Sequence, residues 1–231
     1  MTTRKLAVLH RVCAGYEVAL FRQIAAMEGW KVRLFLGDDL PESRVKSARD
    51  LSGLDVVKLP TRFIRIPGRT LLDHRGLTAA LDEFEPDVLL CEGESNVLSN
   101  LKALAWRRRH PRAGMVHFTI GGLPGETRSW LRSAVLRLLH SGFDSFSAFS
   151  RSGREKLIDL GHAPETVFVT PFVCDTDRNL QAAADCRLTR AEARARLDLP
   201  ERSPRSSWAT WSHTSGWISS FSRPSSSIPI G

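Results

Sequence analysis

The residues in this chain that are best suited to chemistry follow short apolar runs. His117 ends one such run and precedes a loop that contains Gly121 and Gly122. An imidazole at that place can hydrogen-bond a substrate hydroxyl, and glycines let a substrate approach the backbone closely. A histidine in an apolar run is also often a structural residue. We take His117 as the candidate catalytic residue and the two glycines as candidate substrate-binding residues.

A second group follows another apolar run, where Glu92 and Gly93 begin a polar turn. Two carboxylates there, Glu92 and Glu94, can bind an acceptor hydroxyl or act as a base. The alternative is a solvated turn in which Ser95 or Asn96 caps the next helix. Both interpretations stay open for Glu92, and Glu92 and Gly93 are candidate substrate-binding residues.

The first turn of the chain, residues 10–16, limits the ligands that the protein can bind. A dinucleotide-binding fold carries Gly-x-Gly-x-x-Gly at this place, but Gly15 is the only glycine in it. A pyrophosphate then cannot approach the backbone closely, which argues against a nicotinamide or flavin enzyme. The sequence also lacks a phosphate-binding loop of the Gly-Lys-Ser/Thr type. Gly15 is nevertheless a candidate substrate-binding residue, as are Ser150 and Arg151 after a later apolar run.

Positive charge dominates the chain, whose formal net charge is +8. A belt of arginines in the middle of the sequence can attract an anionic lipid surface or a phosphorylated acceptor. The alternative is a solvated face in an arginine-rich chain. Because aromatic residues are not interleaved with this charge, we do not expect nucleic-acid binding. The belt comprises Arg107, Arg108, Arg109, Arg112, Arg128, Arg132, Arg137, Arg151 and Arg154.

Other features of the composition exclude several classes of protein. The four cysteines, Cys13, Cys91, Cys174 and Cys186, have neither paired nor metal-ligand spacing. We therefore expect buried reduced thiols and no metal site. No apolar segment is long enough to be a signal peptide core or a membrane span. These features predict a cytoplasmic protein with, at most, a peripheral contact at the inner membrane face.

Short apolar runs alternate with helical patterns along the chain, which predicts a doubly wound, mostly parallel α/β sheet. The predicted strands are Leu6–His10, Lys31–Leu36, Asp55–Leu59, Asp87–Cys91, Gly114–Phe118, Ser145–Phe149 and Thr166–Thr170. The predicted helices are Glu17–Glu28, Glu42–Leu51, Asp73–Phe84, Val97–Arg109, Ser129–His140 and Gly153–Leu160. His74, His110, His140 and His162 are expected at the surface or at helix ends.

The segment 205–231 differs from the rest of the chain. From Ser203 onward it holds eleven serines and three tryptophans but no lysine and no acidic residue. Since tryptophan has one codon, a reading two bases further on can be partly decoded. That reading gives a buried strand, a glycine turn, a basic turn and the start of an amphipathic helix. We interpret residues 205–231 as an out-of-frame, disordered tail, and the alternative is a genuine serine-rich tail.

The later part of the chain holds a distinctive series of motifs. They are Phe-Ser-Arg-Ser-Gly at residues 149–153, Leu-Gly at 160–161, Pro-Glu at 164–165 and a predicted strand followed by Pro171. This series resembles the inter-domain junction of family-4 glycosyltransferases of the GT-B fold. The decoded tail resembles the first strand and loop of that family's second domain. Phe172 departs from the family, which usually has asparagine there, and the first turn lacks the family's paired glycines.

This resemblance implies a retaining transferase that moves a sugar from a nucleotide-sugar donor to an acceptor. Residues 1–188 would form the Rossmann-like acceptor-side half, residues 189–204 a short helix and linker, and the donor-binding domain would be missing. The expected partners are the nucleotide-sugar donor, as co-substrate without another cofactor, and a glycan or lipid-linked acceptor. We expect the chain to be inactive by itself. The alternative is a non-enzymatic, single-domain α/β interaction protein.

Overall fold

The computed structural model describes residues 3–66, 69–93, 97–119, 130–171, 175–185 and 189–196. The chain divides into two compact units, Met1–Thr176 and Asp177–Gly231. The candidate residues Gly121 and Gly122 lie outside the described residues, as does the whole segment interpreted as out of frame.

The first unit is built on a seven-stranded sheet, which confirms the predicted α/β class. Its strands lie in the order β3-β2-β1-β6-β7-β8-β9, and every neighbouring pair is parallel. The strand order reverses between β1 and β6, as in a doubly wound sheet. The strands are β1 (Arg4–His10), β2 (Trp30–Leu36), β3 (Val56–Lys58), β6 (Val88–Glu92), β7 (Gly114–Thr119), β8 (Ser145–Ala148) and β9 (Val167–Val169). All seven predicted strands are present within two residues of their expected ends.

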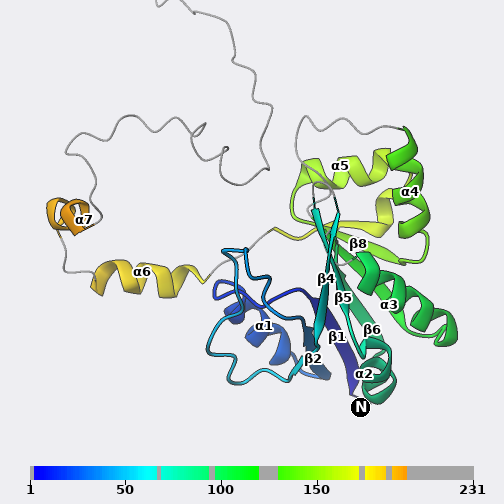
Figure 1. Cartoon of the computed structure of the whole chain (residues 1–231), viewed down its shortest axis with the longest axis horizontal. Coiled ribbons are helices and arrows are strands. Elements are labelled where there is room, and N and C mark those ends of the chain that lie inside the picture. The colour runs from blue at the N-terminus through cyan, green and yellow to red at the C-terminus, as the bar shows by residue number, and fades with distance from the viewer. Residues whose placement is uncertain are drawn as a thin grey trace, which may run out of the picture. The chain divides into compact units, whose positions relative to one another are not determined.

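Helices cover both faces of the sheet, as Figure 1 shows for α1 on one side and α2 and α3 on the other. Alternate residues of β1 point to opposite faces, so Val8 packs in the core under α1 while Ala7 and Leu9 pack in the core under α2 and α3. A third cluster joins Phe146 to Leu157 of α5. The helices are α1 (Val18–Ala25), α2 (Leu77–Phe84), α3 (Val97–Arg109), α4 (Trp130–His140) and α5 (Arg151–Asp159).

The predicted helix Glu42–Leu51 is wrong, because residues 41–51 form turns and irregular backbone. Side chains in this segment bond the backbone locally, and such bonds compete with a helix. Asp39 accepts from the backbone N–H of Ser47 at 2.9 Å, and Ser43 accepts from that of Val45 at 3.2 Å. The backbone N–H of Ala48 donates to the carbonyl oxygen of Cys13 at 2.7 Å, which attaches the segment to the turn after β1.

The helix predicted at Asp73–Phe84 is only partly correct. Its first residues belong to an antiparallel hairpin of β4 (Thr61–Ile66) and β5 (Arg69–His74), which we did not predict, and α2 begins at Leu77. The sequence held a signal for it, since Pro67-Gly68 separates two runs rich in β-branched and apolar residues. His74 is consequently a fully buried strand residue, so the expected place at the surface or at a helix end was wrong for it. His140, although buried, is the last residue of α4, as expected.

Glycines and a serine mark the ends of several helices. Gly29 and Gly161 have positive φ angles of 79° and 103°, a conformation that glycine adopts readily after a helix end. Gly142 does not have a positive φ angle, and its small size instead admits Leu104, whose Cδ2 would lie 2.4 Å from a Cβ. The capping residue of α5 is Ser150, whose Oγ accepts from the Gly153 backbone N–H at 3.0 Å.

The second unit contains α6 (Thr176–Asp185) and α7 (Arg190–Arg196) among its described residues. Thr189 and Glu192 form a capping box before α7. The Thr189 backbone N–H donates to Glu192 Oε2 at 2.7 Å, and the Glu192 N–H donates to Thr189 Oγ1 at 3.3 Å. Across the part of the chain that the structure describes, no helix has the length and apolar character needed to cross a membrane.

The core predicts a clear difference between two leucine substitutions. Leu89 is fully buried in the core under α2 and α3, whereas Leu138 on α4 is 75% exposed. We expect Leu89→Ala to lower the free energy of unfolding by about 2–5 kcal/mol, because it leaves a cavity. Leu138→Ala should change it by less than about 0.5 kcal/mol. Urea denaturation of both variants measures this, and similar losses would contradict the arrangement of the core.

Candidate functional site

The reversal of strand order between β1 and β6 places two polar strand ends side by side. In open parallel sheets, ligands bind in the crevice outside the carboxyl ends of the strands at this reversal. Leu9 pairs with Cys91, so His10 and Glu92 follow at the same edge. Both side chains point to the α1 face, because His10 is two residues after Val8 and Glu92 is two residues after Leu90, which pack there.

His10 lies between two carboxylates at this edge. Its Nε2 is 3.7 Å from Glu17 Oε1, and its Nδ1 is 3.4 Å from Glu92 Oε2. Nδ1 is also 2.6 Å from the carbonyl oxygen of Val12, and because a carbonyl only accepts, Nδ1 carries a proton and donates it. His10 and Glu17 are buried, whereas the Glu92 side chain is 24% exposed. Glu92 is therefore the member of the group that a ligand in the crevice can contact.

Glu17 holds the turn between β1 and α1. The Ala14 backbone N–H donates to Glu17 Oε2 at 2.8 Å, and the Glu17 N–H donates to the Ala14 carbonyl oxygen at 2.8 Å. Burial raises the pKa of the Glu17 carboxyl, while nearby His10 and the bond from Ala14 lower it. We had not singled out Glu17 from the sequence. Its position three residues after Ala14, directly before a helix, is the signal that would have found it.

Glu92 also organises the first turn. It accepts from the backbone N–H of Arg11 at 2.6 Å, across 81 positions of sequence. The carbonyl oxygen of Arg11 accepts from Gly37 at 3.0 Å, so the ends of β1, β2 and β6 are connected. Gly15 lies exposed in this turn, and a Cβ there would have no atom within 4 Å. Space around Gly15 is thus open for a ligand.

His117 lies on the other face of the sheet from Glu92. It is two residues after Met115, which packs under α2 and α3, and it is 5% exposed. Its ring contacts those of His140 and Phe143 at centroid distances of 4.8 and 4.7 Å. Gly93 shares this face, and a Cβ on Gly93 would come within 2.8 Å of His117 Cε1. Gly93 therefore makes room for the imidazole, and the catalytic role of His117 stays a prediction.

A second buried histidine, His74, lies at the end of β5. Its Nδ1 is 2.7 Å from Ser99 Oγ, and Ser99 Oγ accepts from the His74 backbone N–H at 3.0 Å. Gly37 lies beside the His74 ring, and a Cβ on Gly37 would come within 2.4 Å of His74 Nε2. His74 thus packs against the carboxyl end of β2, near the candidate site.

The remaining candidates are placed as follows. Ser150 is exposed as the N-cap of α5, and Arg151 is exposed in its first turn. Both follow β8 and lie at the carboxyl edge of the sheet. Among the residues that the structure describes, no group of three His, Cys, Asp or Glu side chains is arranged to hold a metal ion. Cys13 and Cys91 are buried free thiols, as expected.

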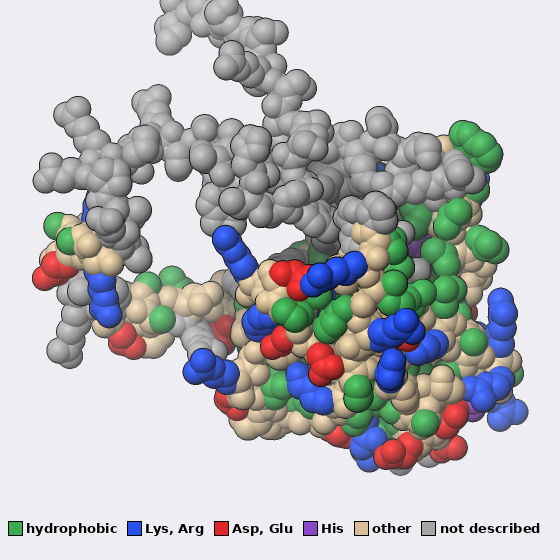
Figure 2. Space-filling model, viewed as in Figure 1, with side chains coloured by type: hydrophobic (Ala, Val, Ile, Leu, Met, Phe, Trp, Pro, Cys, Tyr) green, Lys and Arg blue, Asp and Glu red, His purple; other side chains and the backbone are tan. Residues whose placement is uncertain are grey.

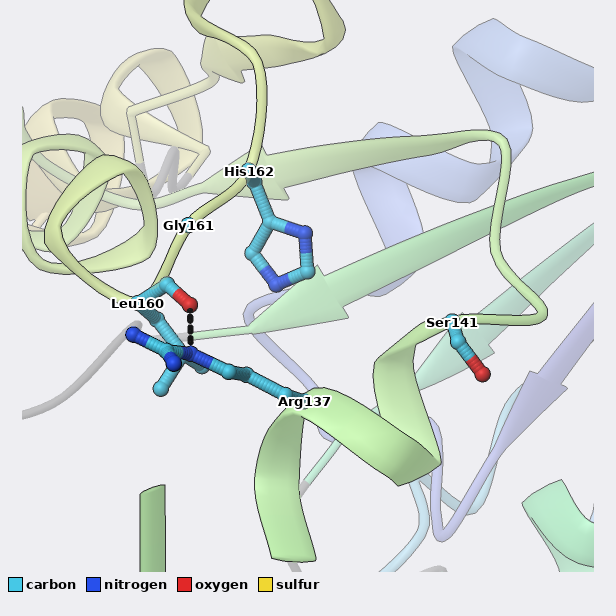
Figure 3. Close-up of a pocket in the computed structure, with 5 residues that line it drawn as sticks. All are labelled: Arg137, Ser141, Leu160, Gly161 and His162. Atoms are coloured by element: carbon cyan, nitrogen blue, oxygen red, sulfur yellow. Dashed lines mark hydrogen bonds between the residues drawn. The ribbon is translucent and has the colours of Figure 1, made fainter. Parts of the chain in front are cut away.

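A cavity of about 450 Å³ lies elsewhere, at the opposite edge of the sheet. It is lined by Arg137, Ser141, Leu160, Gly161 and His162, which come from the ends of α4 and α5 and the turns after them. Figure 3 shows Arg137 reaching the carbonyl oxygen of Leu160, to which its Nε donates, while Ser141 points away. Arg137 therefore caps the end of α5. We do not assign this cavity to the candidate site, because ligands of such sheets bind at the carboxyl edge.

The sequence profile of Glycosyltransferase Family 4 matches residues 17–178, which is more than half of the chain. The chain belongs to this family. The match confirms the resemblance drawn from the sequence and includes Glu17, Glu92, His117 and Ser150. No curated protein matches the chain.

Solved structures of Anabaena HepE show the same fold. Anabaena HepE in complex with UDP and glucose is 13% identical, with a TM-score of 0.53, and the match covers 84% of this chain and 50% of HepE. HepE in complex with UDP-glucose is 14% identical, with the same TM-score and coverage. The lipopolysaccharide outer core galactosyltransferase WaaB is 14% identical, with a TM-score of 0.46 over 71% of this chain and 44% of WaaB. The family-4 chain described here spans about half the length of these structures.

The turn before α1 predicts unequal effects of two substitutions at Glu17. Glu17→Ala leaves the buried Ala14 N–H without its acceptor, so we expect the free energy of unfolding to fall by about 1–3 kcal/mol. Glu17→Gln keeps an oxygen that can accept the bond and should be less destabilising. Urea denaturation at pH 7 compares the two, and equal losses would show that this hydrogen bond does not stabilise the turn.

Two of the buried histidines, His117 and His74, predict a loss of stability in acid. Burial, with smaller effects of His140 and His162, lowers the pKa of His117 to about 3, and burial lowers that of His74 to about 4. Below pH 6.5 the unfolded chain therefore binds protons that the folded chain does not, so stability falls as the pH falls towards 4. Between pH 7.5 and pH 5, each histidine should cost about 2 kcal/mol.

Chemical denaturation at the two pH values, with His117→Leu beside the unsubstituted protein, checks this prediction. The leucine variant should lose less stability on acidification, because position 117 no longer titrates. An unchanged pH dependence in the variant would contradict a buried neutral imidazole at His117.

Proposed function

We propose that this chain is the acceptor-side half of a retaining glycosyltransferase, which moves a sugar from a nucleotide-sugar donor to an acceptor. The observation that carries the proposal is a carboxylate, Glu92, at the strand-order reversal of a sheet whose chain belongs to Glycosyltransferase Family 4. In this proposal Glu92 binds the acceptor hydroxyl from its exposed side, and His10 and Glu17 support it from the buried side.

The other candidates take supporting roles. Gly15 leaves open space in the first turn, and Ser150 and Arg151 present polar groups at the same edge of the sheet. Gly93 leaves room for the ring of His117 next to the end of β6. His117 is the proposed catalytic residue and would act at this place. Gly121 and Gly122 are proposed to line the acceptor site from the loop after β7.

The donor is proposed to bind a second lobe, as the resemblance to the two-domain family implies. The decoded reading of residues 205–231 supports this, because it resembles the first strand and loop of that lobe. Charge that develops on the leaving diphosphate needs basic groups or a helix N-terminus, and the second lobe would supply them. We therefore infer that the chain does not catalyse transfer alone.

The proposed partners follow from the same reasoning. HepE has been solved with UDP and glucose and with UDP-glucose, which supports a nucleotide-sugar donor as co-substrate, without another cofactor. The acceptor is proposed to be a glycan or a lipid-linked sugar, with a peripheral contact to an anionic membrane from the cytoplasmic side and no contact with nucleic acid. A non-enzymatic interaction protein is the second candidate, and the exposed apolar face of α4 favours it.

The test begins at the gene, by sequencing past the Arg205 codon for a frame that encodes a donor lobe. The chain as given should transfer no sugar from UDP-glucose or, tested next, from other nucleotide sugars. A chain in which the downstream reading frame is restored (the frame-restored chain) should transfer sugar. In the restored chain, Glu92→Gln should lower kcat/KM for the acceptor by at least about tenfold. Glu28→Gln, at an exposed position, is the control. A stop without a donor-lobe remnant, or transfer by the chain as given, would reject the proposal.

A further inference from the structure

Helix α4 presents an apolar face to the outside. Trp130, Leu138 and Val135 are 81%, 75% and 50% exposed. Trp130, Ala134 and Leu138 recur every four residues, so they lie along one side of the helix, and Val135 adjoins them. Among the α4 side chains that the structure describes, only His140 is buried. Soluble proteins rarely leave several large apolar side chains together in contact with water, so this face indicates a binding surface.

The charged side chains within α4 are arginines. Residues 128–142 hold three arginines and no acidic residue. Arg137 lies exposed at one edge of the apolar face. At the end of α3, Arg107 pairs with Asp144, just after α4, at 3.4 Å, which brings the exposed Arg108 and Arg109 close to the end of α4. Figure 2 shows hydrophobic side chains gathered over α4 and basic side chains at the adjoining end of α3.

We propose that the outward face of α4 binds the surface of an anionic lipid bilayer. A helix with tryptophan and leucine on one side and arginine beside them inserts its apolar face at the boundary of headgroups and acyl chains, and anionic headgroups bind its cations. A second copy of this chain fits the same face poorly, because both partners carry a formal charge of +8 and bring arginines to the contact.

The direction of α4 connects this surface with the proposed function. The helix follows β7 and returns antiparallel to it, so Trp130 lies towards the carboxyl edge of the sheet, where Glu92 lies. A bilayer bound by α4 would hold a lipid-linked acceptor near that edge. In this respect the inference rests on the proposed function, and it selects the lipid-linked acceptor over a soluble glycan.

The experiment is co-sedimentation of the full chain with vesicles. One set contains equal amounts of phosphatidylglycerol and phosphatidylcholine, and the other contains phosphatidylcholine alone. We expect binding to the anionic vesicles that weakens with salt, and much weaker binding to the neutral ones. Trp130→Ser/Leu138→Ser should reduce binding about tenfold or more. Arg108→Glu/Arg109→Glu should reduce binding to anionic vesicles only.

The matched control is Phe168→Ser/Leu180→Ser, which removes two apolar side chains that are 59% and 69% exposed elsewhere. It should bind as the unsubstituted chain does. No binding to anionic vesicles, or equal losses in the α4 and control variants, would overturn the proposal. So would a dimer in analytical ultracentrifugation that the α4 variant dissociates. Vesicle binding without sugar transfer by the frame-restored chain would reject the transferase alone, whereas transfer without vesicle binding would reject the membrane surface alone.

Discussion

The structure depends on the parallel pairing of β1 with β6, at the point where the order of the strands reverses. This pairing joins residues 4–10 to residues 88–92 and places His10 beside Glu92. It also lets Glu92 accept from the Arg11 backbone, which fixes the path of the first turn. Because helices leave the two strands towards opposite faces, none of the helices that the structure describes covers this end of the pair. The candidate acceptor site is a direct consequence of that topology.

The sheet separates ionisable groups on its two faces. On the α1 face, His10 and Glu17 are buried behind Glu92, which is partly exposed. Glu92 is therefore the polar side chain of this group that faces the crevice. On the opposite face, His117 packs among the rings of His140 and Phe143 and stays neutral because burial lowers its pKa. The two sets share neighbouring strands but have different surroundings. Glu92 opens the first set to the crevice, whereas the second set is enclosed on the other face of the sheet.

The same fold leaves one helix incompletely covered. Helix α3 packs its Trp106 fully into the core, while α4 keeps Trp130 and Leu138 outside. Burial of such side chains is the main favourable term in folding. Because these side chains stay exposed, they indicate a surface that binds a partner. Arginines at the edge of this surface favour a partner that carries negative charge. The acceptor-side half of a family-4 transferase would thereby have both a polar edge for the acceptor and an apolar side for the membrane that carries it.

The amino-acid sequence determined the order of the strands along the chain, because unbroken apolar runs such as residues 6–9 can only be buried strands or helices and are too short to be helices. It also determined that Glu92 and His117 lie at strand ends, and it carried the resemblance to the family. Only the tertiary structure decided that these two residues face opposite sides, because the side-chain direction depends on which neighbour each strand pairs with. The irregular segment at Glu42–Leu51 and the burial of His74 were likewise decided by contacts with residues distant in sequence, Cys13 and Ser99. Local periodicity contains no information about such contacts.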